Sequence, residues 1–181
     1  MKKHLFSIVL LLAVISVALA FRLNFQRFTI PQNGMYPTLP AGSTHWVTMS
    51  RTTSGRDMSV GDIVLFKALH ANKTYTFVWR VVAMPGDRVV IESDKIQING
   101  TQINRKLVRK ESQLGIFAED LGEKSFEVAY DSAAAEDSRI GCDLIVPDGH
   151  VFVLGDNRYN ALDSRYLGAI PINDVFGKLN P

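Results

Sequence analysis

The sequence predicts a mainly β domain of antiparallel strands, preceded by one N-terminal transmembrane helix. An uncharged apolar stretch covers residues 5–21. Beyond residue 30 the apolar runs are short, are separated by Gly, Pro, Asn and Asp, and do not keep a 3.6-residue period over three turns. A chain of 181 residues has room for one such domain after its anchor, but not for two full enzyme domains.

The first apolar stretch is long enough for a short membrane-spanning helix. Lys2 and Lys3 precede it and favour an N terminus inside the cell. We therefore expect residues 1–27 to anchor the chain in the cytoplasmic membrane as a single-pass protein, and residues 28–181 to form a domain on the extracytoplasmic side. The small residues up to Ala20 also fit a signal sequence that is cut after Ala20. Both alternatives stay open, and we favour the retained anchor.

The strands of the domain are predicted from short runs rich in β-branched and aromatic residues. Asn99 and Gly100 suit a tight type I′ hairpin turn, because both residues tolerate a positive φ. Two polar segments, residues 107–121 and 131–143, are expected to be irregular surface excursions. The predicted strands cover residues 63–66, 77–84, 95–98, 101–103, 126–130 and 151–154.

Composition excludes several classes of function. The formal net charge is only +2, which gives no support to nucleic-acid binding. The single cysteine, Cys142, excludes an intrachain disulfide and a metal cluster of two or more thiolates. The four histidines are scattered without the spacing of metal ligands. We therefore expect neither a metal nor a cofactor.

Four short segments follow the anchor in a recognisable order. They are residues 30–39, which hold Gly34-Met35-Tyr36-Pro37; residues 61–67; residues 78–87, which hold Trp79-Arg80; and residues 155–165, which begin with Gly155-Asp156-Asn157-Arg158. Together they resemble the sequence boxes of the type I signal peptidases, membrane-anchored serine proteases that remove signal peptides from exported proteins. The resemblance covers the whole chain and implies that family's antiparallel β domain.

Proteolysis in that family depends on a serine that attacks the peptide carbonyl and an unprotonated lysine that takes its proton. The resemblance places the nucleophile directly before Met35, at Gly34, and the base directly before Arg80, at Trp79. Glycine has no side chain, and the indole nitrogen donates a hydrogen bond but cannot accept a proton. We therefore expect no catalytic residue in this chain.

Shifting the alignment does not restore a dyad. Thr38, the hydroxyl residue nearest to the first box, belongs to the Pro-Thr-Leu element itself. The nearest lysines are Lys67, which we expect to be charged at the end of a strand, and Lys73, which we expect in a polar loop.

The remaining positions of the boxes divide into altered and retained ones. Gln32 stands at the oxyanion-hole position, and Ala161 replaces the serine expected to contact the lysine. Trp79 is interpreted as core packing, since it shares one strand face with Tyr75 and Phe77, although an indole lining a retained peptide groove is the alternative. The residues that would support the site by resemblance are Met35, Pro37, Arg80, Asp156, Arg158, Asp163 and Arg165, and for the last four the alternative is solvated surface charge.

The favoured hypothesis is an inactive relative of signal peptidase I that binds extended segments of secreted or surface proteins during export or assembly. Its expected partners are the membrane and an extended peptide or precursor protein, and an active signal peptidase paralogue is a further candidate partner. The alternative is an active signal peptidase, a serine-type endopeptidase, that uses an unidentified nucleophile. A structural partner that only stabilises an active paralogue is a further rival.

Overall fold

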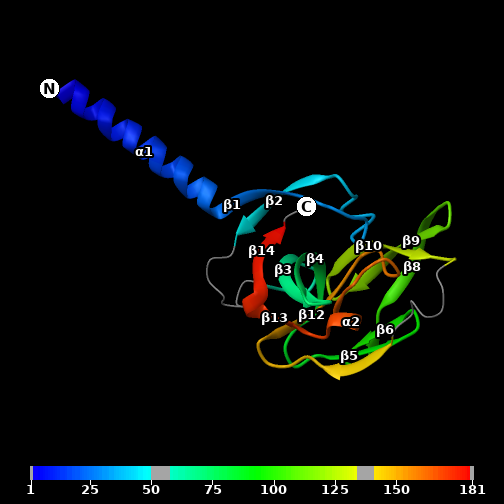
Figure 1. The fold of residues 1–181 in the computed structure, drawn as a ribbon. Coiled ribbons are helices and arrows are strands. Elements are labelled where there is room, and N and C mark those ends of the chain that lie inside the picture. The colour runs from blue at the N-terminus through cyan, green and yellow to red at the C-terminus, as the bar shows by residue number, and fades with distance from the viewer. Residues whose placement is uncertain (1, 50–57, 134–140, 180–181) are drawn as a thin grey trace.

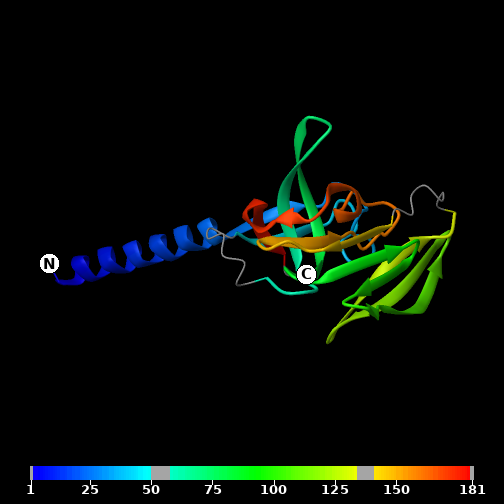
Figure 2. The same ribbon diagram turned by 90° about the horizontal axis from the view of Figure 1, so that it is seen from below.

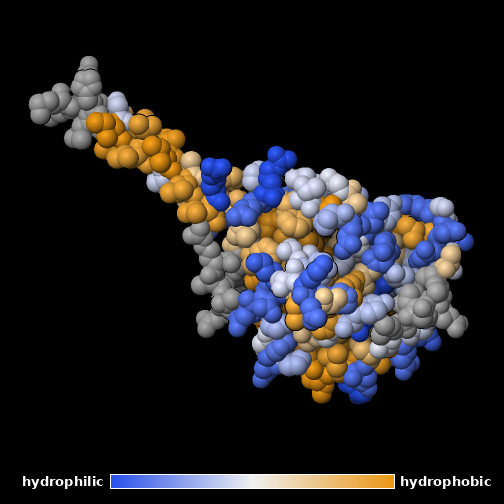
Figure 3. Space-filling model, viewed as in Figure 1, coloured by the Kyte–Doolittle hydropathy of each residue, from blue (hydrophilic) through white to orange (hydrophobic). Residues whose placement is uncertain are grey.

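The computed structural model describes residues 2–49, 58–133 and 141–179, and of residues 2–5 it describes the backbone alone (Figure 1). Helix α1 (Lys2–Asn24) extends away from a β domain. Its segment Phe6–Asn24 has a mean hydropathy of 2.5 and is, within the described ranges, the one helix long and apolar enough to cross a membrane. Figure 3 shows apolar side chains along this helix. The predicted fold class, an N-terminal apolar helix before a mainly antiparallel β domain, is confirmed.

The largest sheet has seven strands in the order β1-β2-β14-β3-β4-β12-β13, and its pairs are antiparallel. The strands are β1 (Phe25–Thr29), β2 (Thr44–Met49), β14 (Val175–Leu179), β3 (Ile63–His70), β4 (Lys73–Ala83), β12 (His150–Leu154) and β13 (Ile170–Pro171). Val64 and Leu65 are adjacent in β3 and both buried, so the middle of this sheet is covered on its two faces.

Two smaller sheets complete the domain. The strands β10 (Lys124–Asp131), β9 (Leu114–Leu121) and β8 (Asn104–Glu111) form one of them in this order. The other has the order β11 (Cys142–Ile145), β5 (Arg88–Glu92), β6 (Lys95–Ile98) and β7 (Thr101–Gln102). The short helices α2 (Ser164–Leu167) and η3 (Ile172–Asp174) lie between β12 and β14 in the chain.

Each predicted strand coincides with an observed strand, and the 95–103 hairpin turns at Asn99 and Gly100 with positive φ at both residues. The expectation for residues 107–121 is wrong, because they lie in the β8–β9 hairpin. Most β8 side chains are exposed, so this strand shows no alternation of apolar and polar residues to reveal it. Of the second predicted excursion, Asp131 ends β10 and Cys142 begins β11, while residues 134–140 lie outside the described residues.

The β3–β4 hairpin stands out beyond the rest of the domain (Figure 2). Its turn residues Ala71 and Asn72 have φ values of 47° and 62°, which a type I′ turn requires. Lys73 begins β4, so the expectation that it lies in a loop is wrong. Lys67 is exposed, as expected, but lies within β3 rather than at its end.

Candidate functional site

The segment between β1 and β2 is fixed against the segment that follows β12. The backbone N–H of Asn157 donates to the carbonyl oxygen of Gly34 at 3.0 Å, and its side-chain Nδ2 donates to the carbonyl oxygen of Asn33 at 3.1 Å. Met35 is buried, and Pro37 is half-buried after a cis peptide bond. Two boxes far apart in the sequence are thus joined at residue 34.

Strand β4 brings Trp79 to the same place. The indole is 2% exposed, and its Nε1 donates to the carbonyl oxygen of Leu162 at 2.9 Å. An ideal Cβ atom on Gly34 would lie 2.3 Å from Cη2 of Trp79 and 2.5 Å from Cζ3. One on Gly155 would lie 3.1 Å from Cζ3. The indole therefore fills the space in front of residue 34, and the two glycines leave room for it.

Beside this filled position, one edge of β4 is paired over only part of its length among the described residues. Strand β3 pairs with β4 from Lys73 to Arg80, whereas β12 pairs with β4 only from Arg80 to Ala83. In the described part of the chain, the stretch of β4 before Arg80 is therefore paired on one side only. A hollow lies there, and the residues lining it include Gln32, Tyr75, Phe77, Ala161, Leu162 and Tyr166.

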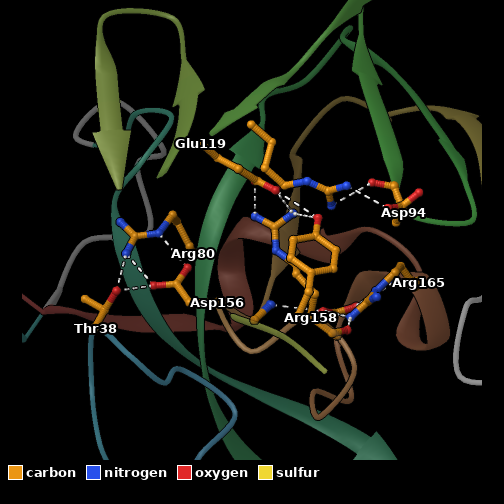
Figure 4. Close-up of polar contacts among 11 residues, drawn as sticks. Thr38, Arg80, Asp94, Glu119, Asp156, Arg158 and Arg165 are labelled. Carbon is orange, nitrogen blue, oxygen red and sulfur yellow. Dashed lines mark hydrogen bonds and ion pairs between the residues drawn. The ribbon is translucent and has the colours of Figure 1, made fainter. Parts of the chain in front are cut away.

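A buried ion pair lies below the site (Figure 4). Arg80 binds Asp156 with two hydrogen bonds, Nε to Oδ1 at 2.8 Å and Nη2 to Oδ2 at 2.6 Å. The hydroxyl of Thr38 donates to the same carboxylate at 2.5 Å, and Nη1 of Arg80 donates to the carbonyl oxygen of Gly61. The side chains of Arg80 and Asp156 are 7% and 0% exposed. Through these contacts the pair joins all four boxes.

Asp163 and Arg165 hold the last box. Arg165 donates to Asp163 with Nε and Nη2, each at 2.8 Å, and Nη2 also donates to the carbonyl oxygen of Arg158. The carboxylate of Asp163 accepts the N–H of Gly155 at 2.9 Å. Asp163 is fully buried, so solvated surface charge does not describe it.

Arg158 reaches a partner that sequence reasoning missed. Its Nη2 lies 2.6 Å from Glu119 of β9, and the hydroxyl of Tyr130 donates to the same carboxylate at 2.8 Å. Burial, together with Glu119, raises the pKa of Tyr130 to about 12. Glu119 lies in the segment expected to be irregular, and no motif marks it in the sequence.

The three-stranded sheet also contacts the first box. The hydroxyl of Tyr36 donates to Glu111 at the end of β8, and this hydrogen bond raises the pKa of Tyr36. Glu111 accepts a second hydrogen bond from Arg109, which also binds Glu127 at 2.7 Å. Tyr36 thus connects the first box to β8.

Known proteins resemble this chain over most of its length. The chain matches the family described as signal peptidase, peptidase S26, over residues 2–181. It is 30% identical over 168 residues to signal peptidase I of Bacillus caldolyticus, which covers 93% of this chain and 84% of that protein. It is 31% identical over 179 residues to signal peptidase IB of Staphylococcus aureus, covering 92% and 85%. The crystal structure of a signal peptidase I from Enterococcus faecalis is 26% identical, with a TM-score of 0.44 over 70% of this chain and 100% of that one.

Proposed function

Because the chain belongs to the peptidase S26 signal peptidase family, we propose that it binds the type of segment its relatives cut but does not cut it. The bound segment is extended and rich in small residues, and it belongs to a secreted or surface protein during export or assembly. The protein acts from a single membrane anchor, with its β domain on the extracytoplasmic side.

The observation that carries this proposal is the unpaired edge of β4 next to the hollow. An extended peptide can add to such an edge through backbone hydrogen bonds, which need neither a serine nor a lysine. Tyr75 and Phe77 line the hollow and supply an apolar surface for small side chains. Binding and chemistry therefore depend on different residues.

The missing chemistry follows from the two replaced side chains. Loss of one member of a catalytic unit costs on the order of 10⁶-fold in rate, and loss of the second adds little. With Gly34 and Trp79 at the dyad positions, only preorganised hydrogen-bond donors and binding remain, and these supply about 10³- to 10⁴-fold over water.

Continuity of the anchor with the domain supports a retained helix. Helix α1 runs without a break past Ala20 to Asn24, and β1 begins at the next residue. The ring of Phe21 packs against Trp46 of β2 with centroids 5.6 Å apart. A cut after Ala20 would leave Phe21 at a free chain end, whereas a retained helix keeps Phe21 inside α1.

Peptide binding to the full-length protein in detergent tests the proposal. A fluorescent peptide with two small residues in an Ala-x-Ala arrangement should bind, and a matched peptide with tryptophan at both alanines should not, because the segment proposed to bind presents small side chains to the hollow beside Phe77. Fluorescence anisotropy measures both. Equal binding of the two peptides, or no binding at millimolar concentration, contradicts the proposal.

The same preparation tests the rival of an active peptidase. A precursor protein incubated with the untreated protein should stay intact in mass spectrometry. Cleavage above background that survives removal of contaminating proteases would show that an unidentified nucleophile works.

A further inference from the structure

A second hollow adjoins the first on the far side of residue 34. Its lining includes Asn33, Tyr36, Glu111, Gln113, Asp131 and Asn157. Tyr159 and Asn160 line both hollows, so the two are neighbours along the surface. Gln32 lines only the first, whereas Asn33 and Tyr36 line only the second. An extended chain that passes residue 34 therefore leaves one hollow and enters the other.

The two linings differ in chemistry. The first is rich in aromatic and apolar side chains, such as Tyr75, Phe77 and Leu162. Among the described residues, the first holds no Asp, Glu, Lys or Arg, whereas the second combines Leu114, amides and hydroxyls with the carboxylates of Glu111 and Asp131, without a lysine or arginine. One chain that fills both therefore meets acidic side chains only after it has passed residue 34.

The charges around the second hollow favour a cationic occupant. Arg109 binds both Glu111 and Glu127, so one guanidinium is shared by two carboxylates. Asp131 accepts the backbone N–H of Ala133 at 2.8 Å and is not in an ion pair within the described part of the chain. Lys110 lines a third hollow, which adjoins the second and shares Ser112 and Gln113 with it, so one further cation lies nearby. The carboxylates thus outnumber the cations at this surface.

Tyr159 forms the wall between the hollows. Its ring meets that of Tyr130 edge to face with centroids 5.4 Å apart, and Tyr130 is buried. The ring of Tyr159 is therefore held in place by a buried neighbour, and a chain that crosses it meets a fixed aromatic surface.

We propose that the bound segment continues past Gly34 across Tyr159 into the second hollow, where it places a stretch that carries lysine or arginine. This inference rests on the proposed function. The bound segment is not cut where it passes residue 34, so its two halves stay joined. The contact of the second half therefore forms at a high effective concentration. The protein thereby selects a precursor by the residues on both sides of the position where relatives cut.

Three fluorescent peptides test this inference with the full-length protein in detergent. The first ends after its Ala-x-Ala segment, the second continues with six residues that include two lysines, and the third replaces these lysines with glutamates. Exposed ion pairs are individually weak, so we expect the lysine peptide to bind about 3- to 10-fold more tightly than the short one at low salt. The glutamate peptide should show no such gain, and high salt should remove it.

Variants locate the contact. Asp131→Asn should reduce the gain from lysine and leave binding of the short peptide unchanged. Glu92→Gln, an exposed carboxylate on β5 that lines neither hollow, is the matched control and should keep the gain. The Asp131 variant leaves the Arg109–Glu111 pair in place, so it separates lost charge from lost structure.

The outcomes separate the two proposals. If all three peptides bind equally, or if lysine and glutamate give the same gain, the inference about the second hollow is wrong while the proposed function stands. If none of the three binds, the proposed function itself fails.

Discussion

The indole of Trp79 occupies the space into which a side chain on residue 34 would project, since an ideal Cβ there would lie 2.3 Å from Cη2. Real Cβ atoms essentially never come so close to another heavy atom, so one partner would have to move. Residues 34 and 79 are therefore sterically coupled: the tryptophan fits because residue 34 is glycine. A side chain can be introduced at residue 34 only if the indole moves or is replaced.

A double-mutant cycle should measure this coupling. Gly34→Ala alone should destabilise the protein by about 1–3 kcal/mol through overpacking, and Trp79→Ala by about 3–5 kcal/mol through the cavity it leaves. The double variant should cost about 1–2 kcal/mol less than the sum, because the shortened side chain makes room for the methyl group. Urea unfolding of the full-length protein in detergent gives the three values. Combining Gly34→Ala with Trp46→Ala, the other tryptophan, is the control and should be additive.

Restoring the dyad should produce slow cleavage. Gly34→Ser together with Trp79→Lys supplies a hydroxyl and an amine in the frame fixed by Asn157. The rate should stay low because Gln32 and Ala161 lack the hydroxyls that a relative would use, and one missing donor costs about 10²- to 10³-fold. Adding Gln32→Ser and Ala161→Ser should therefore accelerate processing of a precursor, followed on gels. Gly34→Ala with Trp79→Lys must remain inactive, and cleavage by that control would refute the assignment of residue 34.

Burial should decide how much an arginine–aspartate pair matters. Arg80–Asp156 and Arg88–Asp143 are both held by two hydrogen bonds through Nε and Nη2, but the side chains of the second pair are 58% and 55% exposed. Asp156→Asn leaves a buried guanidinium without its counter-charge and should cost about 3–5 kcal/mol. Asp143→Asn should change stability little. Equal losses in urea unfolding would contradict the assignment of Asp156 to a buried framework.

Acid should weaken the contacts of Asp62. Burial alone would raise its pKa, but hydrogen bonds from Lys178, the N–H of Ser59 and Lys124 outweigh burial and hold the pKa below the ordinary 3.8. A carboxyl whose pKa is lower in the folded state adds stability above its unfolded pKa and loses it as the pH falls through the folded value. Asp62→Asn should therefore lower Tm at pH 7, and the difference from the native protein should shrink between pH 5 and about pH 2.

Thermal unfolding across this range measures the effect. Glu92→Gln, which changes an exposed carboxylate, should follow the native protein at every pH. A gap between Asp62→Asn and the native protein that stays constant down to pH 2 would mean that the lysine contacts do not stabilise the fold.

The parts of the fold that could be predicted are those where burial leaves a pattern. Phe77 and Trp79 belong to a stretch of β4 that is buried without interruption to Ala83, and Asn99-Gly100 marks its own turn. Strand β8 could not be predicted, since its exposed, charged side chains resemble a loop. Glu119 could not be predicted as a site residue either, because its role depends on Arg158, which lies far along the chain and is buried beside it.

Helix α1 ends at Asn24 and β1 begins at Phe25, so the chain has no slack between its anchor and its largest sheet. With the helix in a bilayer, the domain cannot drift away from the lipid surface as a flexibly tethered module would. The height at which the unpaired edge of β4 is presented is then a property of the fold. If the protein binds precursors as proposed, a precursor has to expose its segment at that same height, so the anchor sets the distance from the membrane at which binding occurs.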